Sequence, residues 1–192
     1  MKQWAAGDDD RLIARTLAGD AAAFETLYRR YATAVYRLAY RLTGNAADAE
    51  EVMQDSFLKA HAALHQYRGA APLWSWLKSL TVRRALRHLR RARYRHWLGL
   101  DAIAEPAISD TTAPLAAAAD LEQALARLDA TDRAVLWLHH GEGYRHAEIA
   151  ALWGKSLSFS KSRLARAERR LREHLQATES AHPQATWHEE LV

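Results

Sequence analysis

Apolar residues recur every three to four positions through most of this chain, and that spacing favours helices over any other regular structure. The clearest apolar stripe consists of Phe24, Leu27, Tyr31, Val35, Leu38 and Leu42. Asp20 precedes this stripe and can cap a helix, while Gly44 follows it and can end one. No stretch alternates apolar and polar residues for long enough to suggest a strand. We therefore predict an all-α protein.

Two more helices are predicted in the first half of the chain. One begins at Asp48 and passes through Val52 and Phe57 to Tyr67. Residues 68–72 contain glycine and proline, which predict a loop. The next helix runs from about Leu73 to Tyr94, and the candidates for its apolar side are Trp76, Leu77, Leu80, Leu86 and Leu89.

The middle of the chain has the composition of a linker. Residues 98–119 show no helical stripe and contain Pro106 and Pro114. Leu121, Leu125 and Leu128 then return to helical spacing. We therefore expect two small helical domains, over residues 1–97 and 120–176, joined by a flexible linker over 98–119. Residues 177–192 are expected to form a disordered tail.

Residues 144–172 predict a helix-turn-helix. Ile149 and Trp153 lie on one face of the first helix, Gly154 can take the left-handed turn that ends it, and Ser156 can cap the second helix. The expected buried stripe of the second helix is Leu157, Leu164, Ala167, Leu171 and Leu175. Its cations fall largely outside that stripe, which is typical of a helix that reads DNA. An ordinary helical hairpin with a solvated basic face is the alternative.

Charge is distributed unevenly along the chain. Residues 56–100 hold ten cations and no acid, residues 101–132 hold seven acids and one cation, and residues 141–176 hold eight cations and four acids. Aromatic residues interrupt the first basic block, namely Tyr67, Trp74, Trp76, Tyr94 and Trp97. Aromatic rings among cations suit unpaired bases, which must be stacked as well as neutralised. The pattern indicates a nucleic-acid partner.

Several function classes are disfavoured by the sequence. The chain has no cysteine, which excludes a disulfide scaffold and a thiolate metal site. No apolar run is long enough for membrane insertion, and Asp8, Asp9 and Asp10 are unlike a signal peptide, so we expect a cytoplasmic protein.

A metal centre and an enzymatic site are also not expected. The tempting ligand cluster is His139, His140, Glu142, His146 and Glu148. It lacks the His-Glu-x-x-His spacing, and Gly141 and Gly143 are expected to break the chain between its members. No glycine-rich phosphate loop or nucleophile elbow is present either. We predict no metal, no cofactor and no catalytic residue.

The order and spacing of several motifs resemble those of one bacterial family. The motifs are Asp48-Ala-Glu-Glu-Val-Met-Gln-Asp-Ser-Phe57, Tyr67-Arg68-Gly69, Trp74-Ser75-Trp76-Leu77, the segment Leu121–Leu128, Glu148-Ile-Ala150 and Lys161-Ser-Arg-Leu164. Over residues 11–175 the chain resembles an extracytoplasmic-function (ECF) sigma factor of the sigma-70 family. That resemblance implies an initiation factor that binds core RNA polymerase, directs it to promoter DNA and helps to melt the −10 element. It also implies an anti-sigma factor as a further partner.

The resemblance also implies sites. An acidic helix face suits a basic protein partner, and the resemblance names the clamp helices of the largest polymerase subunit, with the flap as a further contact. The core-polymerase residues are expected to be Asp48, Glu51, Gln54 and Asp55. The residues expected at the −10 element are Tyr67, Arg68, Gly69, Trp74, Arg83, Arg84 and Arg87, whereas Trp76 is assigned to the core.

The −35 element is expected to be read by Lys161, Ser162, Arg163 and Arg166. Base-edge contacts are assigned to Ser162 and Arg166, and phosphate or mixed contacts to Lys161 and Arg163.

Some residues depart from the family pattern. Asp129 stands where proline is usual, Arg83 where asparagine is frequent, and Ser158-Phe159-Ser160 where Gly-Thr-Val is usual. A competing hypothesis is a conventional helix-turn-helix regulator that acts without docking on polymerase. It accounts for residues 120–176 but for neither the basic aromatic block nor the acidic helix before it.

Overall fold

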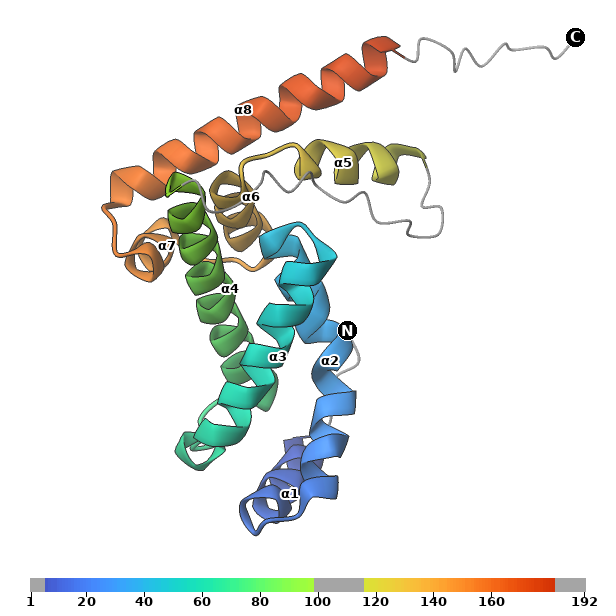
Figure 1. The fold of residues 1–192 in the computed structure, drawn as a ribbon, viewed down its shortest axis with the longest axis vertical. Coiled ribbons are helices and arrows are strands. Elements are labelled where there is room, and N and C mark those ends of the chain that lie inside the picture. The colour runs from blue at the N-terminus through green and yellow to red at the C-terminus, as the bar shows by residue number, and fades with distance from the viewer. Residues whose placement is uncertain (1–5, 99–115, 182–192) are drawn as a thin grey trace, which may run out of the picture. The chain divides into compact units, whose positions relative to one another are not determined.

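The computed structural model describes residues 6–98 and 116–181, and all regular structure within them is helical (Figure 1). The chain divides into two compact units, residues 1–107 and 108–192. The prediction of two helical domains is therefore confirmed. None of the helices in the described ranges is both long and apolar enough to cross a membrane.

The predicted linker and tail lie mostly outside the described residues. Residues 116–119, assigned to the linker, belong to a helix that begins at Ala116. Residues 177–181, assigned to the tail, are the last turn of a helix that ends at Ala181.

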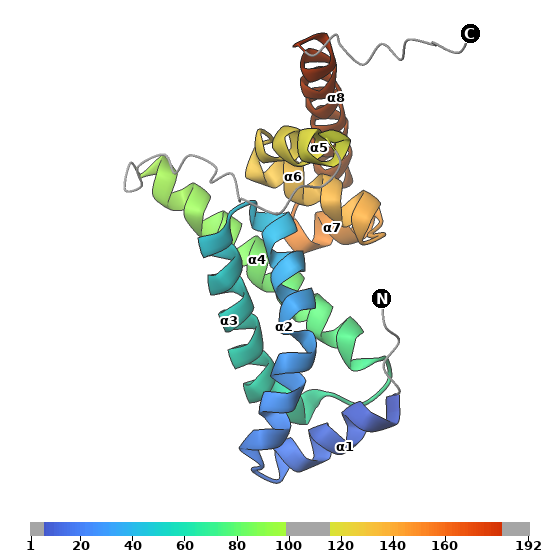
Figure 2. The same cartoon turned by 90° about the vertical axis from the view of Figure 1, so that its right-hand side faces the viewer.

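The N-terminal unit contains α1 (Ala6–Leu17), α2 (Ala21–Thr43), α3 (Ala46–Ala63), a short 3-10 turn η1 (Leu64–Gln66) and α4 (Leu73–Trp97). Helices α2, α3 and α4 pack against one another, and α1 lies across one end of α2 (Figure 2). The predicted loop at 68–72 joins η1 to α4.

Helix α2 has the predicted caps and core face. The Asp20 carboxylate accepts hydrogen bonds from the backbone N–H groups of Ala22 and Ala23, at 3.0 and 3.2 Å. Gly44 ends the helix in the left-handed conformation, with φ of 83°. The stripe is buried except for Phe24, which is half-buried. This stripe faces α3 and α4 and forms the centre of the unit.

Helix α3 differs from its predicted bounds at both ends. Asn45, not Asp48, is the N-cap, and its side-chain oxygen accepts the Asp48 backbone N–H at 2.8 Å. Asp48 lies in the first turn, where a carboxylate also suits the helix dipole. The helix ends at Ala63 and not at Tyr67, because the chain tightens into η1. The predicted inward residues Val52 and Phe57 are buried.

Helix α1 was not predicted. Its Asp9 is buried and accepts hydrogen bonds from the Arg30 guanidinium and the Tyr31 hydroxyl of α2. Burial and this carboxylate raise the pKa of Tyr31. Helix α1 is therefore attached to α2 by a polar contact as well as by its apolar residue Ile13, which is buried.

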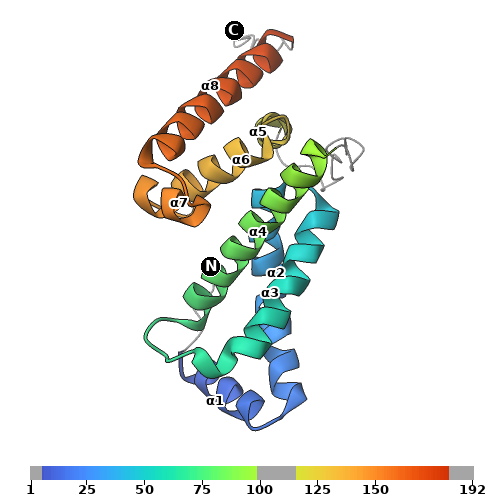
Figure 3. The ribbon, with the colours of Figure 1, turned by 60° about the vertical axis from the view of Figure 1, so that its left-hand side comes forward.

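The C-terminal unit contains α5 (Ala116–Ala126), α6 (Ala130–Leu136), a π-helical turn η2 (Trp137–Gly141), α7 (His146–Trp153) and α8 (Leu157–Ala181). Helix α8 packs against α5, α6 and α7 (Figure 3). Asp129 caps α6 by accepting the N–H groups of Thr131 and Asp132, so aspartate serves as a helix start in the place of the family's proline. Gly154 ends α7 with φ of 62°, as predicted.

The buried stripe of α8 starts at a different residue from the predicted one. Leu157 is 46% exposed, whereas Ser160 is fully buried and hydrogen-bonds to His146 Nδ1 at 3.0 Å. Leu164 and Ala167 are buried as predicted, and Leu171 and Leu175 are half-buried. Packing against α7 therefore turns Ser160, one turn before Leu164, toward the core in place of Leu157.

Candidate protein-docking and nucleic-acid interfaces

Helix α3 presents an exposed face that combines acids with one apolar residue. Glu51, Gln54 and Asp55, three of the four residues expected to bind polymerase, are exposed. Leu58 follows Asp55 by three positions and Glu51 by seven, so it continues the same helical face, and it is 70% exposed. The sequence analysis missed Leu58, although its spacing from the acids was available as a signal. A polar rim around an apolar centre is the usual composition of a protein interface.

Asp48, the fourth expected residue, is committed to a contact within the unit. Its Oδ1 lies 2.9 Å from Nε2 of His88 on α4, and Oε1 of Glu51 lies 3.4 Å from Nδ1 of the same ring. His88 is only 7% exposed. Contact with Asp48 raises the pKa of His88, while contact with His88 lowers the pKa of Asp48. The buried ring of His88 therefore lies between two carboxylates that favour its charged form, a role that no local sequence motif signals.

Among the described residues, Asp48, Glu51 and His88 form a group whose possible metal-ligand atoms all lie within 4.8 Å of one another. The two carboxylates nevertheless approach different ring nitrogens of His88. Nitrogens on different sides of one ring cannot both point at a single ion. The arrangement therefore suits an electrostatic contact between α3 and α4 better than a metal centre.

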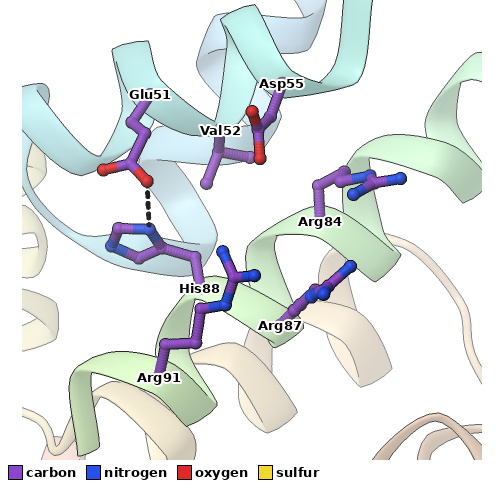
Figure 4. Close-up of a pocket in the computed structure, with 7 residues that line it drawn as sticks. All are labelled: Glu51, Val52, Asp55, Arg84, Arg87, His88 and Arg91. Atoms are coloured by element: carbon purple, nitrogen blue, oxygen red, sulfur yellow. Dashed lines mark ion pairs between the residues drawn. The ribbon is translucent and has the colours of Figure 1, made fainter. Parts of the chain in front are cut away.

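The acidic face of α3 borders the basic face of α4. Figure 4 shows a shallow hollow with Glu51 and Asp55 on one side and Arg84, Arg87 and Arg91 on the other. The sequence analysis assigned these acids to polymerase and Arg84 and Arg87 to promoter DNA. The structure brings the two sets together at one hollow. Arg83, also expected at DNA, is exposed on α4 but does not line it.

The loop before α4 holds the aromatic residues of the expected −10 site. The Tyr67 hydroxyl donates a hydrogen bond to the Ala71 carbonyl at 2.6 Å, which closes the loop. Gly69 has φ of 70°, a backbone conformation that side-chain-bearing residues rarely adopt. Arg68 and Gly69 are exposed, whereas Tyr67 and Trp74 are half-buried.

The ring contacts in this region connect both tryptophans to the hydrophobic core or its edge. Trp74 is stacked on Tyr31 of α2, with ring centroids 6.2 Å apart. Trp76 packs against Tyr67, with centroids 5.6 Å apart, and adjoins the hydrophobic core. Trp76 is half-buried at the edge of that core, as Trp74 is, so its assignment to the core stays a prediction.

On α8, the four expected −35 residues have two different environments. Lys161, Ser162 and Arg166 are exposed. Arg163 is turned toward α6, where its Nη1 lies 2.9 Å from Oδ1 of Asp132. Phe159 belongs to the Ser-Phe-Ser segment that departs from the family pattern. It is half-buried and lies against Trp153 of α7, with ring centroids 6.1 Å apart.

The histidine cluster of the C-terminal unit has other partners. His139 Nδ1 lies 3.0 Å from the Tyr144 carbonyl, and its ring stacks on that of His146. His140 Nε2 contacts Glu168 at 2.8 Å. Glu148 accepts the Arg145 backbone N–H at 2.7 Å and so helps to cap α7. These side chains support the helix-turn-helix through separate contacts rather than converging on one point.

Two sigma-factor family models match the chain, one to each unit. Sigma-70 region 2 matches residues 27–95, and Sigma-70 region 4 matches residues 118–171. The ECF RNA polymerase sigma factor SigM of Mycobacterium tuberculosis is 34% identical over 163 residues, which cover 85% of this chain and 82% of SigM. SigL of the same species is 33% identical over 168 residues, which cover 85% of this chain and 95% of SigL.

Two solved structures are also similar to this chain. The sigma factor RpoE of Bartonella quintana, in complex with the anti-sigma factor NepR, is 26% identical with a TM-score of 0.59, covering 80% of this chain and 96% of RpoE. CnrH, in complex with the cytosolic domain of CnrY, is 27% identical with a TM-score of 0.50, covering 88% of this chain and 98% of CnrH.

The match to region 2 covers the basic aromatic block and the acidic helix, which a conventional helix-turn-helix regulator does not account for. The chain belongs to the ECF sigma factors of the sigma-70 family, non-enzymatic transcription initiation factors that bind core RNA polymerase and direct it to promoters.

Proposed function

We propose that the exposed face of α3 is the main docking site for core polymerase, through the clamp helices of its largest subunit. The observation that carries this proposal is the alignment of Leu58 with Glu51, Gln54 and Asp55 on one exposed helical face. The acids steer and orient a basic partner, and the leucine supplies apolar area that docking buries. Asp48 contributes indirectly, because its carboxylate contacts His88 of α4 and not a partner.

Each of the two units contacts a different promoter element. The loop at 67–74 and the arginines of α4 engage the −10 element, where Gly69 lets the backbone approach an unstacked base and Tyr67 or Trp74 offers a flat ring. Arg68, Arg83, Arg84 and Arg87 supply charge for phosphates.

In the C-terminal unit, Lys161, Ser162 and Arg166 face the −35 element, and this unit also meets the polymerase flap. Ser162 and Arg166 read base edges, whereas Lys161 contacts phosphate. Arg163 shares this turn of α8 but is bonded to Asp132. The site of action is the cytoplasm, where polymerase and promoter are found. An anti-sigma factor, such as the one bound to RpoE, would cover the same polymerase-facing surface.

The test of the docking face is a titration of core polymerase with the double variant Glu51→Lys/Asp55→Lys. The matched control is Glu25→Lys/Glu173→Lys, which changes the net charge equally at two exposed acids on α2 and α8. We expect the first variant to lose affinity and the control to keep it, with unchanged helix content by circular dichroism in both. Equal affinity for the two variants would remove this face from the interface.

A further inference from the structure

Arg163 differs from its neighbours on α8 in how much of its side chain is engaged. Its Nη1 lies 2.9 Å from Oδ1 of Asp132 and 3.3 Å from Oδ1 of Asp129. The guanidinium carbon also lies 5.6 Å from the centroid of the Phe159 ring. The side chain is 18% exposed. Arg163 is therefore held on three sides by its own domain.

The burial of Asp132 makes the loss of this contact energetically costly. The residue is 0% exposed, and a buried carboxylate is tolerated only with a cation and hydrogen bonds beside it. Its second oxygen has no hydrogen bond among the described residues, and the next cation, Arg170, lies 3.9 Å from it. If Arg163 turned outward to a phosphate, Asp132 would lose its closest cation. The charge of Arg163 is thus committed within the protein.

The contact joins the two helices whose relative position sets the reading surface. Asp129 and Asp132 belong to the start of α6, and Arg163 lies in the second turn of α8, between Ser162 and Arg166. A fixed guanidinium at this point fixes the rotation of α8 about its axis. Base readout depends on that rotation, because a hydrogen bond to a base edge tolerates little misplacement.

We propose that Asp132 and Arg163 form a positioning pair that sets the orientation of the reading helix, and that Arg163 makes no contact with DNA. This rests on the proposed role of α8 at the −35 element. It replaces the expectation that Arg163 contributes a phosphate contact, and it assigns a role to Asp132, which no motif of the reading helix includes.

The test uses the full chain bound to core polymerase, with two readouts. One is the salt dependence of holoenzyme binding to promoter DNA, whose slope reports the number of phosphate contacts. The other is initiation from a library of −35 elements, which reports base preference. Lys161→Ala should reduce the slope by about 0.9, equivalent to roughly threefold between 50 and 200 mM salt. Arg163→Ala should leave the slope unchanged and flatten the base preferences.

The decisive variant replaces the whole pair. Apolar residues of similar size often substitute for a buried ion pair without loss of stability, so Asp132→Leu/Arg163→Met should restore the wild-type base preferences with an unchanged slope. If circular dichroism shows that this variant does not fold, Asp132→Asn/Arg163→Gln keeps a hydrogen bond across the same contact and takes its place. Recovery in either folded double variant supports the positioning role.

The opposing result is a slope that falls by about 0.9 in Arg163→Ala and in the folded double variant, with base preferences intact, as for a phosphate contact. The Lys161→Ala and Arg166→Ala variants distinguish a failure of the positioning role from a failure of the proposed role of α8 at the −35 element. If α8 does not read the −35 element, neither of those variants changes the slope or the preferences. If only the positioning role is wrong, both variants behave as expected and Arg163→Ala behaves like Lys161→Ala.

Discussion

Truncation of Leu58 isolates the apolar part of the proposed docking face. Leu58 is 70% exposed, so Leu58→Ala removes little from the folded monomer, and alanine keeps the helix propensity of α3. Full burial of a leucine side chain is worth about 1.5–3 kcal/mol. Scaled by the exposed fraction, docking gains about 1–2 kcal/mol from this residue. Its removal should weaken polymerase binding roughly 5- to 30-fold.

A fluorescence titration of labelled chain with core polymerase measures this loss. The matched control is Leu17→Ala, because Leu17 is also an exposed leucine of the N-terminal unit, 54% exposed at the end of α1. We expect the control to bind like the wild type and both variants to unfold at the wild-type temperature. Unchanged affinity for Leu58→Ala, or an equal loss in the control, would refute the assignment of this face.

Three further predictions concern other parts of the chain. Arg166→Ala should cost roughly 1–3 kcal/mol of base discrimination at the −35 element, measured by initiation from a promoter library; a uniform loss of strength with intact preferences would make it a phosphate contact instead. Contact with Asp48 raises the pKa of His88 above 6.5, so this contact stabilises the N-terminal unit fully below pH 6.5 and weakens as the pH rises through the raised pKa. The melting temperature should therefore fall as the pH rises from 6.5 through the raised pKa in the wild type, and fall less in His88→Gln. Asp20→Ala removes the N-cap of α2 and should lower the free energy of unfolding by about 1 kcal/mol in a urea titration, without altering base preferences.

Local features of the fold were predictable because their causes lie close together in the sequence. The start of α2 at Asp20 and its end at Gly44 follow from a capping side chain and a left-handed glycine. The turn at Gly154 follows in the same way. The family motifs added what local physics could not, namely an expectation of which exposed residues serve polymerase and which serve DNA.

Contacts between distant residues were not predictable, because they depend on how helices cross. His88 lies 40 residues after Asp48 in the chain, and no spacing rule links them. Asp132 and Arg163 are 31 residues apart, so Arg163 resembled another outward-facing cation of α8. Helix α1 was missed because its attachment depends partly on Asp9, which in the sequence resembles a solvated acid.

The most direct test of this account is initiation by core polymerase reconstituted with the chain on a library of promoter fragments. The wild-type chain should give discrete start sites with preferred −10 and −35 elements. The Glu51→Lys/Asp55→Lys variant should give none, although its fold is intact, while Arg166→Ala should still initiate with relaxed preference at the −35 element only. Normal initiation by the acidic-face variant, or loss of −10 preference in Arg166→Ala, would contradict the division of labour between the two units.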